Sequence, residues 1–284
     1  MKRTMGICLL AASMVFSGCE LFDKKKDDDK GGTEQPKGGG GGGGGAPAMD
    51  LSTMIQVPGY MMLGEGAAVG QKVALTSKGQ GYSNSYMVAI VGEDGDNWKV
   101  ESTMMTAAYG EQGKDQLVGM VVDKKTGKVS KAVVGKKGEK GKDVKITPMD
   151  PPKKGEAAEG EDTEVKLAMG GPYPAKLYTQ DIPNVGKVKT WSGTDGELKG
   201  VMLKTESPNS KCELKEMPKK GSADVGGSKV EFTTLVYDDG HETSTSDHPA
   251  IKAINYGMFK NKQAGNTTEV TAVASDAKPE LKWD

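Results

Sequence analysis

The chain has 284 residues, and its 38 basic and 39 acidic residues leave a formal net charge of −1. Arg3 is the only arginine. Nucleic-acid binders rely on a basic surface and on the planar guanidinium group for phosphate and base contacts, so this composition excludes nucleic acid as a partner.

The first 18 residues have the pattern of a secretory leader. Two basic residues come first, an apolar run follows from Met5 to Phe16, and two small residues precede Cys19. The apolar run is too short to cross a bilayer as a permanent helix. The pattern predicts a signal peptide over residues 1–18. An ordinary leader cut at another position is the alternative, but it leaves the Cys19 thiol unexplained.

The residues around the predicted cut resemble those of bacterial lipoproteins. In that family a cysteine follows the cut, matched by Cys19, and small residues precede it, matched by Ser17 and Gly18. Phe16 stands where leucine is usual. The resemblance implies a diacylglyceryl group and a further acyl chain on Cys19, and three chains at about 0.8 kcal/mol per buried methylene make membrane attachment permanent. Glu20 stands where enterobacterial lipoproteins kept at the inner membrane carry Asp, so we expect the outer membrane, facing the periplasm.

Residues 19–50 lack the apolar side chains of a core. A mixed lysine and aspartate block, 24–30, is followed by eight consecutive glycines from Gly38 to Gly45. A phosphate-binding loop would need glycines at set spacings before a Lys-Ser or Lys-Thr pair, which this segment lacks. Glycine-rich segments are flexible coils, and about 30 such residues reach roughly 30 Å. We therefore expect a flexible tether between the lipid and a folded domain.

Residues 51–284 alternate between apolar and polar side chains with a period of two, which predicts one antiparallel β domain. The clearest hairpin has a turn at 92–97 between strands at 86–90 and 98–102. A second hairpin joins Gln116–Val122 to Val129–Val134. Consecutive hairpins of this kind build a meander.

The second half of the domain continues the strand pattern beyond a Lys-, Pro- and Gly-rich segment, 135–164, which we expect to be a long exposed loop. Gly59–Gly66 and Pro172–Tyr178 fit short helical turns or strand starts equally well. About eleven strands predict an all-β fold, a large antiparallel meander that forms an open barrel or a sandwich with few or no long helices. The other predicted strands are Val69–Leu75, Lys187–Trp191, Leu198–Leu203, Lys211–Leu214, Lys229–Tyr237, Glu242–Ser246, Ala253–Phe259 and Glu269–Ala274.

In strand order and compartment, residues 55–275 resemble the Lol-type lipoprotein carriers and receptors. Those proteins form an incomplete barrel of antiparallel strands around an apolar groove that accepts acyl chains. The resemblance implies a groove of this kind here. It rests on the strand pattern and not on a motif, and the chain lacks the clear helical segments with which that family covers its groove.

Methionine is frequent, with 16 residues against four phenylalanines. It occurs as the pairs Met61-Met62 and Met104-Met105. Flexible thioether side chains fill irregular cores, and they also line adaptable apolar grooves. We take Met61, Met62, Met104 and Met105 as candidate ligand-binding residues.

Two further groups are candidates for chemistry. His241 and His248 flank carboxylates, which suggests a metal site. Strand residues seven apart point to opposite faces, however, so a polar, solvent-facing hairpin is the better interpretation, and we expect no metal and no other cofactor. Cys212 alternates with charged residues and shares a face with Leu214, which favours a buried, unreactive thiol over a reactive one.

The sequence contains no Gly-x-Ser-x-Gly elbow and no cluster of catalytic residue types, so we do not expect an enzyme. The prediction is a lipid-anchored envelope protein that binds an apolar or amphipathic ligand in a methionine-lined groove. The alternative is a structural or protein-interaction module of the envelope, with a partner protein held at sheet edges and at the lysine-rich segment 135–164.

Overall fold

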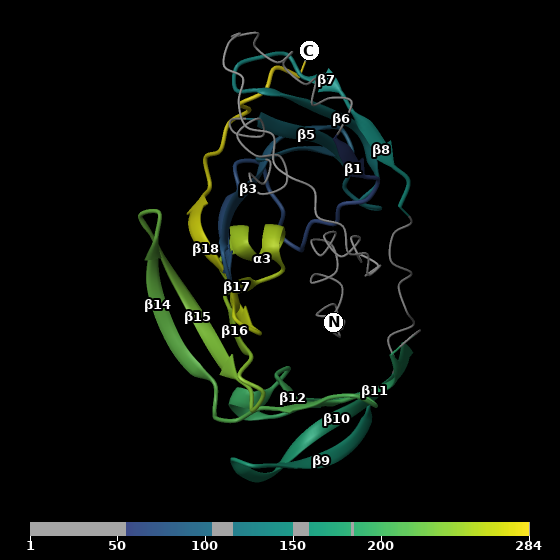
Figure 1. The fold of residues 1–284 in the computed structure, drawn as a ribbon, viewed down its shortest axis with the longest axis vertical. Helices are drawn as coiled ribbons and strands as arrows, with labels where there is room; N and C mark the ends of the chain where they lie inside the picture. Colours follow the sequence, from purple (N-terminus) through teal and green to yellow (C-terminus); the bar gives the residue numbers. More distant parts are fainter. Residues whose placement is uncertain (1–54, 104–115, 150–158, 183–184, 284) are drawn as a thin grey trace, which may run out of the picture.

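Antiparallel sheets dominate the structure, a computed structural model that describes residues 55–103, 116–149, 159–182 and 185–283. The described strands form an eleven-stranded sheet, a five-stranded sheet and a two-stranded sheet (Figure 1). The predicted all-β class is confirmed, and the large sheet remains open, with a free strand at each edge.

The eleven-stranded sheet combines two meanders. In order across the sheet its strands are β14 (Lys219–Val225), β15 (Ser228–Val236), β16 (Glu242–Thr245), β17 (Met258–Gln263), β18 (Asn266–Ala274), β2 (Lys72–Gly79), β3 (Tyr82–Asp94), β4 (Asn97–Thr103), β5 (Gln116–Asp123), β6 (Val129–Lys136) and β7 (Lys142–Asp143). All neighbouring strands in it are antiparallel. One meander runs from β2 to β7 and the other from β14 to β18, and the pairing of β18 with β2 joins them.

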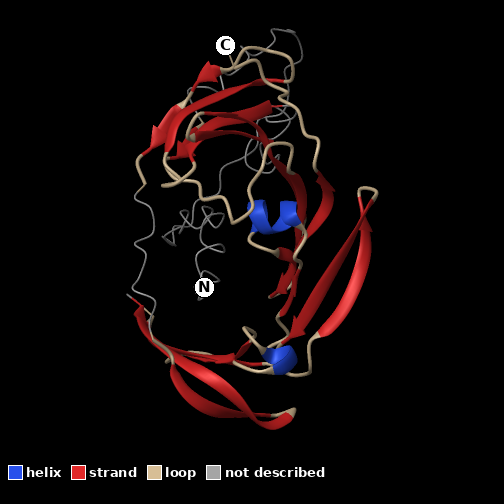
Figure 2. Ribbon diagram, turned by 180° about the vertical axis from the view of Figure 1, so that it is seen from behind, coloured by secondary structure: helices blue, strands red, loops and turns tan. Residues whose placement is uncertain are grey.

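The other elements are smaller. The five-stranded sheet has the order β13 (Lys211–Glu213), β12 (Met202–Glu206), β11 (Gly186–Gly193), β10 (Gly170–Ile182) and β9 (Glu161–Leu167), while β1 (Gln56–Pro58) and β8 (Lys145–Thr147) form a parallel pair. Helix α3 (Pro249–Asn255) lies against the large sheet, and the 3-10 turn η2 (Gly196–Leu198) lies beside the smaller one (Figure 2). Within the described residues, no helix is long and apolar enough to span a membrane.

The two predicted hairpins of the first meander are present. Strands β3 and β4 join at Asp94–Asn97, where Gly95 has a φ of +55°. At the turn between β5 and β6, an Asp123 carboxylate oxygen accepts hydrogen bonds from the backbone N–H groups of Lys125 (3.0 Å) and Thr126 (2.7 Å). Polar turn residues and glycine at positive φ therefore set both registers, as expected from the sequence.

The predicted strand Ala253–Phe259 is wrong. Its first residues end helix α3, and only the last two belong to β17. Pro249 occupies the first turn of the helix, and Tyr256 ends it in the left-handed conformation with a φ of 50°. Two helical turns are too short to show a clear 3.6-residue period, but proline at the start was a usable signal.

Other boundaries also differ from the predicted ones. The expected strand Leu198–Leu203 is mostly η2 and a loop, because β12 begins at Met202. Pro172–Tyr178 lies inside β10, whereas Gly59–Gly66 is neither helix nor strand and contributes one isolated bridge, from Tyr60. The expected loop 135–164 is mostly exposed but includes β7, β8 and the start of β9, and its residues 150–158 lie outside the described ranges.

Apolar side chains cover both faces of the first meander. On one face, Val100 and Met120 pack with Ile55 and Val57 from the segment that contains β1. Farther along the sheet, the buried α3 side chain Ile251 joins a second cluster with β2. On the opposite face, Leu281 is buried in a third cluster with strands β3, β5 and β6. The first meander is therefore sandwiched between segments far from it in sequence.

The segment 280–283 is held by one fully buried carboxylate, that of Glu101 on β4. Glu101 accepts hydrogen bonds from the backbone N–H groups of Glu280 (2.9 Å) and Leu281 (3.0 Å) and from the indole N–H of Trp283 (2.9 Å). The Trp283 ring lies on Gly119, where an added Cβ would come within 2.9 Å of it. Three neutral donors thus satisfy a charge that would otherwise be costly to bury.

We predict that Glu101→Gln destabilises the fold. The amide NH2 cannot accept the hydrogen bonds that one carboxylate oxygen now accepts, and an unsatisfied buried donor costs about 1–3 kcal/mol. Urea unfolding followed by tryptophan fluorescence measures the loss. Glu164→Gln, at an exposed position on β9, is the matched control and should change the free energy of unfolding little. Equal stability of the two variants would contradict the role assigned to Glu101.

Candidate functional site

The second meander contains a sharply bent hairpin. Strand β15 pairs with β16 only over residues 233–236, because β16 is four residues long and the chain then leaves the sheet toward α3. The rest of β15 pairs with β14 alone. At the hairpin tip, an added Cβ on Gly226 would lie 3.1 Å from Ala272 on β18. The β14–β15 hairpin therefore curls back over the face of β17 and β18 (Figure 1).

A groove of about 410 Å³ lies between this hairpin and strands β16–β18. We call it the hairpin groove. Its apolar end is formed by Ala223, Val225, Phe232, Phe259 and Val270. The Phe232 and Phe259 rings stack with their centroids 4.7 Å apart and an interplanar angle of 13°. Stacked aromatic rings give this end a rigid apolar floor.

A β-bulge brings Phe259 to the groove. Ser244 pairs with Lys260, but Thr245 pairs with Met258, so Phe259 is an extra residue in β17. Bulges bend a strand and change the direction of a side chain. Phe259 and its neighbour Lys260 consequently both line the groove, although adjacent strand residues normally point to opposite faces.

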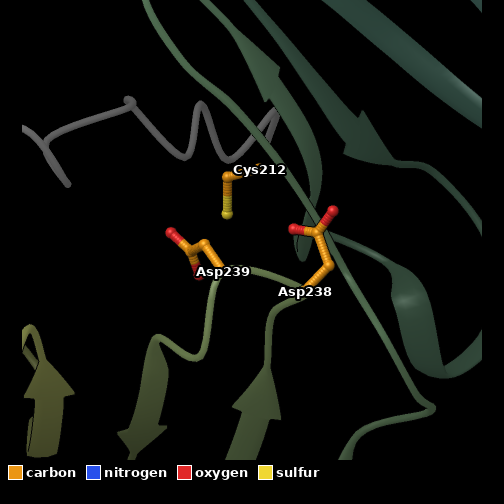
Figure 3. Close-up of side chains that lie close together, drawn as sticks. All are labelled: Cys212, Asp238 and Asp239. Atoms are coloured by element: carbon orange, nitrogen blue, oxygen red, sulfur yellow. The ribbon is translucent and has the colours of Figure 1, made fainter.

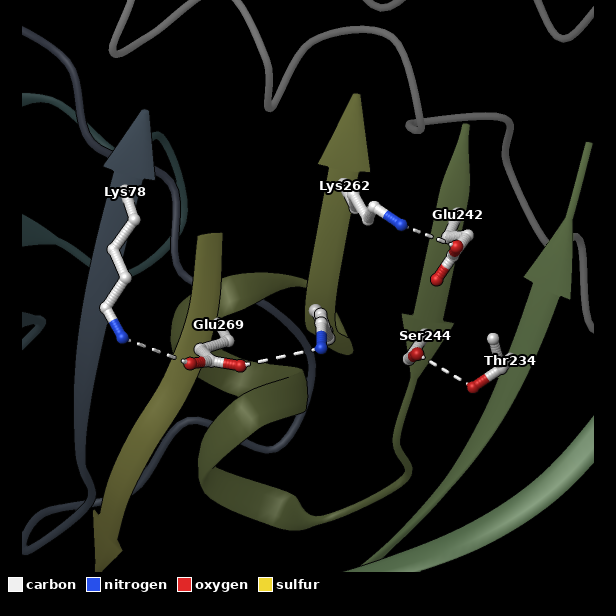
Figure 4. A network of polar contacts seen from close by, with 7 residues as sticks. Lys78, Thr234, Glu242, Ser244, Lys262 and Glu269 are labelled. Carbon is white, nitrogen blue, oxygen red and sulfur yellow. Dashed lines mark hydrogen bonds and ion pairs between the residues drawn. The ribbon is translucent and has the colours of Figure 1, made fainter. Parts of the chain in front are cut away.

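The other end of the hairpin groove is polar. The hydroxyl oxygens of Thr234 and Ser244 are 2.8 Å apart, and Lys262 donates to the Glu242 carboxylate at 3.0 Å. Glu269 forms an ion pair with Lys78 on one side, at 4.0 Å, and one with Lys260 on the other, at 3.7 Å. These side chains lie on one face of neighbouring strands (Figure 4). The charged residues that line the groove are Asp224, Glu242, Lys260 and Glu269, so its lining is amphipathic, whereas Lys78 and Lys262 lie beside it.

A second cluster lies where the two larger sheets meet. Leu214, just after β13, bridges to Tyr237, just after β15. At this junction Cys212 faces Asp238 and Asp239, and one ligand atom of each lies within 4.8 Å of the others (Figure 3). These three residues are the group that could hold a metal ion in the part of the chain that the structure describes.

Hydrogen bonds already occupy both aspartates of this junction. Asp238 accepts from the backbone N–H of Glu213, and Asp239 accepts from that of His241, both at 2.9 Å. Burial raises the pKa of the Cys212 thiol to about 12, and the nearby charges of Asp239 and Asp238 add to the effect. A metal ion would have to displace the thiol proton and compete with the turn. We assign these residues a structural role at the junction between the two sheets.

The histidines of the sequence hypothesis have separate surroundings. His241 Nε2 lies 2.7 Å from the side-chain oxygen of Asn261 and 2.9 Å from the Thr243 hydroxyl. His248 occupies the N-cap position of α3 and is half-buried, and its Nδ1 has no hydrogen-bond partner. Neither histidine belongs to the described cluster of metal-ligating side chains.

Of the four methionines expected to bind a ligand, the two that the structure describes do not line the hairpin groove. Met61 packs against the core beneath β1, and Met62 is 40% exposed. Met104 and Met105 lie outside the described residues, as does Cys19. The groove's aromatic floor was missed by sequence reasoning, although Phe232 and Phe259 are the only phenylalanines in residues 51–284.

Comparison with known proteins gives no relative: no family model, no curated protein and no solved structure matches this chain.

We predict that Cys212 reacts slowly in the folded protein. With a pKa near 12 in place of the usual value near 8.5, the thiolate fraction at pH 8 and the alkylation rate fall about a thousandfold. Iodoacetamide labelling of the Cys212 peptide, followed by mass spectrometry, measures the rate with and without urea. Asp239→Asn should speed labelling of the folded protein, and Asp96→Asn, at an exposed distant site, should not. Fast labelling of the unaltered folded chain would contradict the protonated thiol.

Proposed function

We propose that the protein is a lipid-anchored protein of the bacterial envelope that binds an amphipathic ligand in the hairpin groove, without catalysis. The observation that carries this proposal is the stacked Phe232–Phe259 floor at one end of a groove whose other end is charged. Ligand sites are concave and mostly apolar with a few placed polar groups, and their volumes run from about 300 to 1,000 Å³. The volume of the hairpin groove falls in this range, and its lining combines apolar side chains with more polar ones than is usual for such a site.

The ligand residues of this proposal differ from the sequence prediction. Phe232 and Phe259 take the place of the methionines, while the expectation of an apolar or amphipathic ligand is retained. The incomplete barrel implied by the Lol-type resemblance is compatible with an open eleven-stranded antiparallel sheet. In this chain, however, the groove lies between a hairpin and the sheet.

The anchor is proposed from the residues around Cys19. Lipid on that residue would hold the domain at the outer membrane, and the glycine-rich tether would let the groove stand roughly 30 Å from the bilayer surface. A ligand that leaves the membrane would then meet the groove at a high local concentration.

A protein-interaction module is the second candidate. Strand β14 has a neighbour on one side only among the described strands, so its free edge offers backbone groups to an added strand. Its two leading residues, Lys219 and Lys220, are charged, and lysine on an edge strand discourages unspecific pairing.

We predict that filling the groove prevents binding. Thr271 lines the groove and its side chain is exposed, so Thr271→Trp should occupy the space without disturbing the core. The probe is the uncharged fluorophore N-phenylnaphthylamine, whose emission rises in apolar sites. The full chain carrying Cys19→Ser is used so that detergent does not compete. Thr271→Trp should weaken probe binding at least about tenfold.

The matched control is Thr179→Trp, at an exposed position on β10. It adds the same side chain far from the hairpin and should bind the probe as the parent chain does. Absence of probe binding by the parent chain, or equal binding by both tryptophan variants, would refute the hairpin groove as the ligand site.

A separate prediction concerns the anchor. Cys19→Ser should abolish incorporation of labelled palmitate and move the protein from the membrane fraction to the soluble periplasmic fraction, because the acyl chains are the proposed attachment. Cys212→Ser should remain in the membrane fraction with its label. Unchanged membrane association of Cys19→Ser would disprove the lipoprotein assignment. That result would not bear on the groove proposal.

A further inference from the structure

The charges at the polar end of the hairpin groove alternate in sign across the strands. Lys78 on β2 is followed by Glu269 on β18 and then by Lys260 and Lys262 on β17, with Glu242 on β16. Of these five residues, Glu269, Lys260 and Glu242 line the groove, together with Asp224 on β14, whereas Lys78 and Lys262 lie beside it. Glu269 lies between two lysines, and Glu242 is paired with Lys262. Both signs are therefore present within one patch, on neighbouring strands (Figure 4).

All five charged side chains remain accessible. Their exposed fractions range from 33% for Glu269 to 61% for Lys78. Exposed ion pairs contribute little to stability, so a ligand can replace one partner of a pair at low cost. The group that is released must then find a new partner of the correct sign, because electrostatic complementarity decides specificity at such a surface.

The alternating pattern discriminates between head groups. A purely anionic head group can pair with Lys260 but places its charge beside Glu242 or Glu269, and a purely cationic one that takes Glu269 leaves Lys260 without a partner for its charge. A head group with both charges can give its ammonium to a carboxylate and its phosphate to a lysine. Ammonium N–H donors and phosphate acceptors both form charge-assisted hydrogen bonds.

The apolar end limits the rest of the ligand. Val225, Phe259 and Val270 are buried, but Phe232 is only half-buried, so its ring offers apolar surface within the groove. The hairpin groove, at about 410 Å³, is at the small end of ligand sites. These dimensions suit one hydrocarbon chain.

We propose that the hairpin groove selects a single-chain amphiphile whose head group carries both an ammonium and a phosphate, as in lysophosphatidylethanolamine. This inference rests on the proposed function and deepens it by naming the ligand class. The hydrocarbon chain lies along Phe232 and Phe259, the ammonium takes Glu269, and the phosphate takes Lys260.

The test compares three ligands with the same acyl chain, each below its micelle-forming concentration. They are lysophosphatidylethanolamine, the anionic lysophosphatidylglycerol and uncharged monoacylglycerol, and each displaces N-phenylnaphthylamine from the full chain carrying Cys19→Ser. The zwitterionic lipid should bind about tenfold more tightly than either of the others, as expected for two exposed charge contacts made together.

Two charge variants test which protein side chain contacts which charged group of the lipid. Glu269→Gln should reduce the advantage of the zwitterionic over the anionic lipid, because the ammonium loses its carboxylate. Lys260→Gln should weaken both phospholipids relative to monoacylglycerol. Glu164→Gln and Lys166→Gln, at exposed positions on β9, are the matched controls and should leave the order of affinities unchanged. Thermal unfolding of each variant confirms that the fold is intact.

The outcomes separate the two proposals. If the probe binds and Thr271→Trp blocks it, but the three lipids bind equally or the anionic or uncharged one binds best, the head-group inference fails and the groove stands. If the lipid order does not change in Glu269→Gln and Lys260→Gln, the assignment of these residues fails. If no lipid displaces the probe, the ligand class is wrong.

Discussion

The pairing of β18 with β2 is the interaction on which the rest of the fold depends. Its register runs from Thr267 opposite Lys78 to Ala274 opposite Lys72, so it joins residues about 200 positions apart. Without it, the two meanders would be separate sheets, each with a further free edge. Burial of β2 and β18 side chains in one cluster offsets the entropy of closing so long a loop. The same pairing places Lys78 beside Glu269 and so completes the polar end of the hairpin groove.

One short helix shapes both faces of the second meander. Strand β16 ends at Thr245 because the chain turns away to form α3, whose buried residue Ile251 fills one face of the sheet. The far half of β15 is thereby left without a neighbour on its β16 side and bends, with β14, over the other face. Covering one face and opening a groove on the other are consequences of the same interruption in the strand order.

The sequence predicts the fold class well and the groove poorly. Alternation and turn residues identify β3, β4, β5 and β6, since these strands are long and their apolar faces are buried. Strand β9 escapes detection because only Val165 and Leu167 of its seven residues are buried. The groove depends on a bulge at Phe259 and on the bend of a hairpin, which follow from tertiary packing and leave no periodic pattern. The methionine hypothesis stays a prediction: the described pair, Met61 and Met62, does not line the hairpin groove, because the frequency of a residue type does not indicate its position.

Glu101 has a consequence for the partly folded chain. Its three hydrogen-bond donors come from Glu280, Leu281 and Trp283, about 180 residues farther along the chain. Until this segment has folded onto the sheet, the carboxylate is bare, without these donors. A bare carboxylate stays hydrated and so keeps water at this position of the sheet. Charges at such positions act as gatekeepers, since they oppose the association of exposed strands with other molecules. Once the segment 280–283 is in place, its three hydrogen bonds satisfy the carboxylate and offset the cost of burying it.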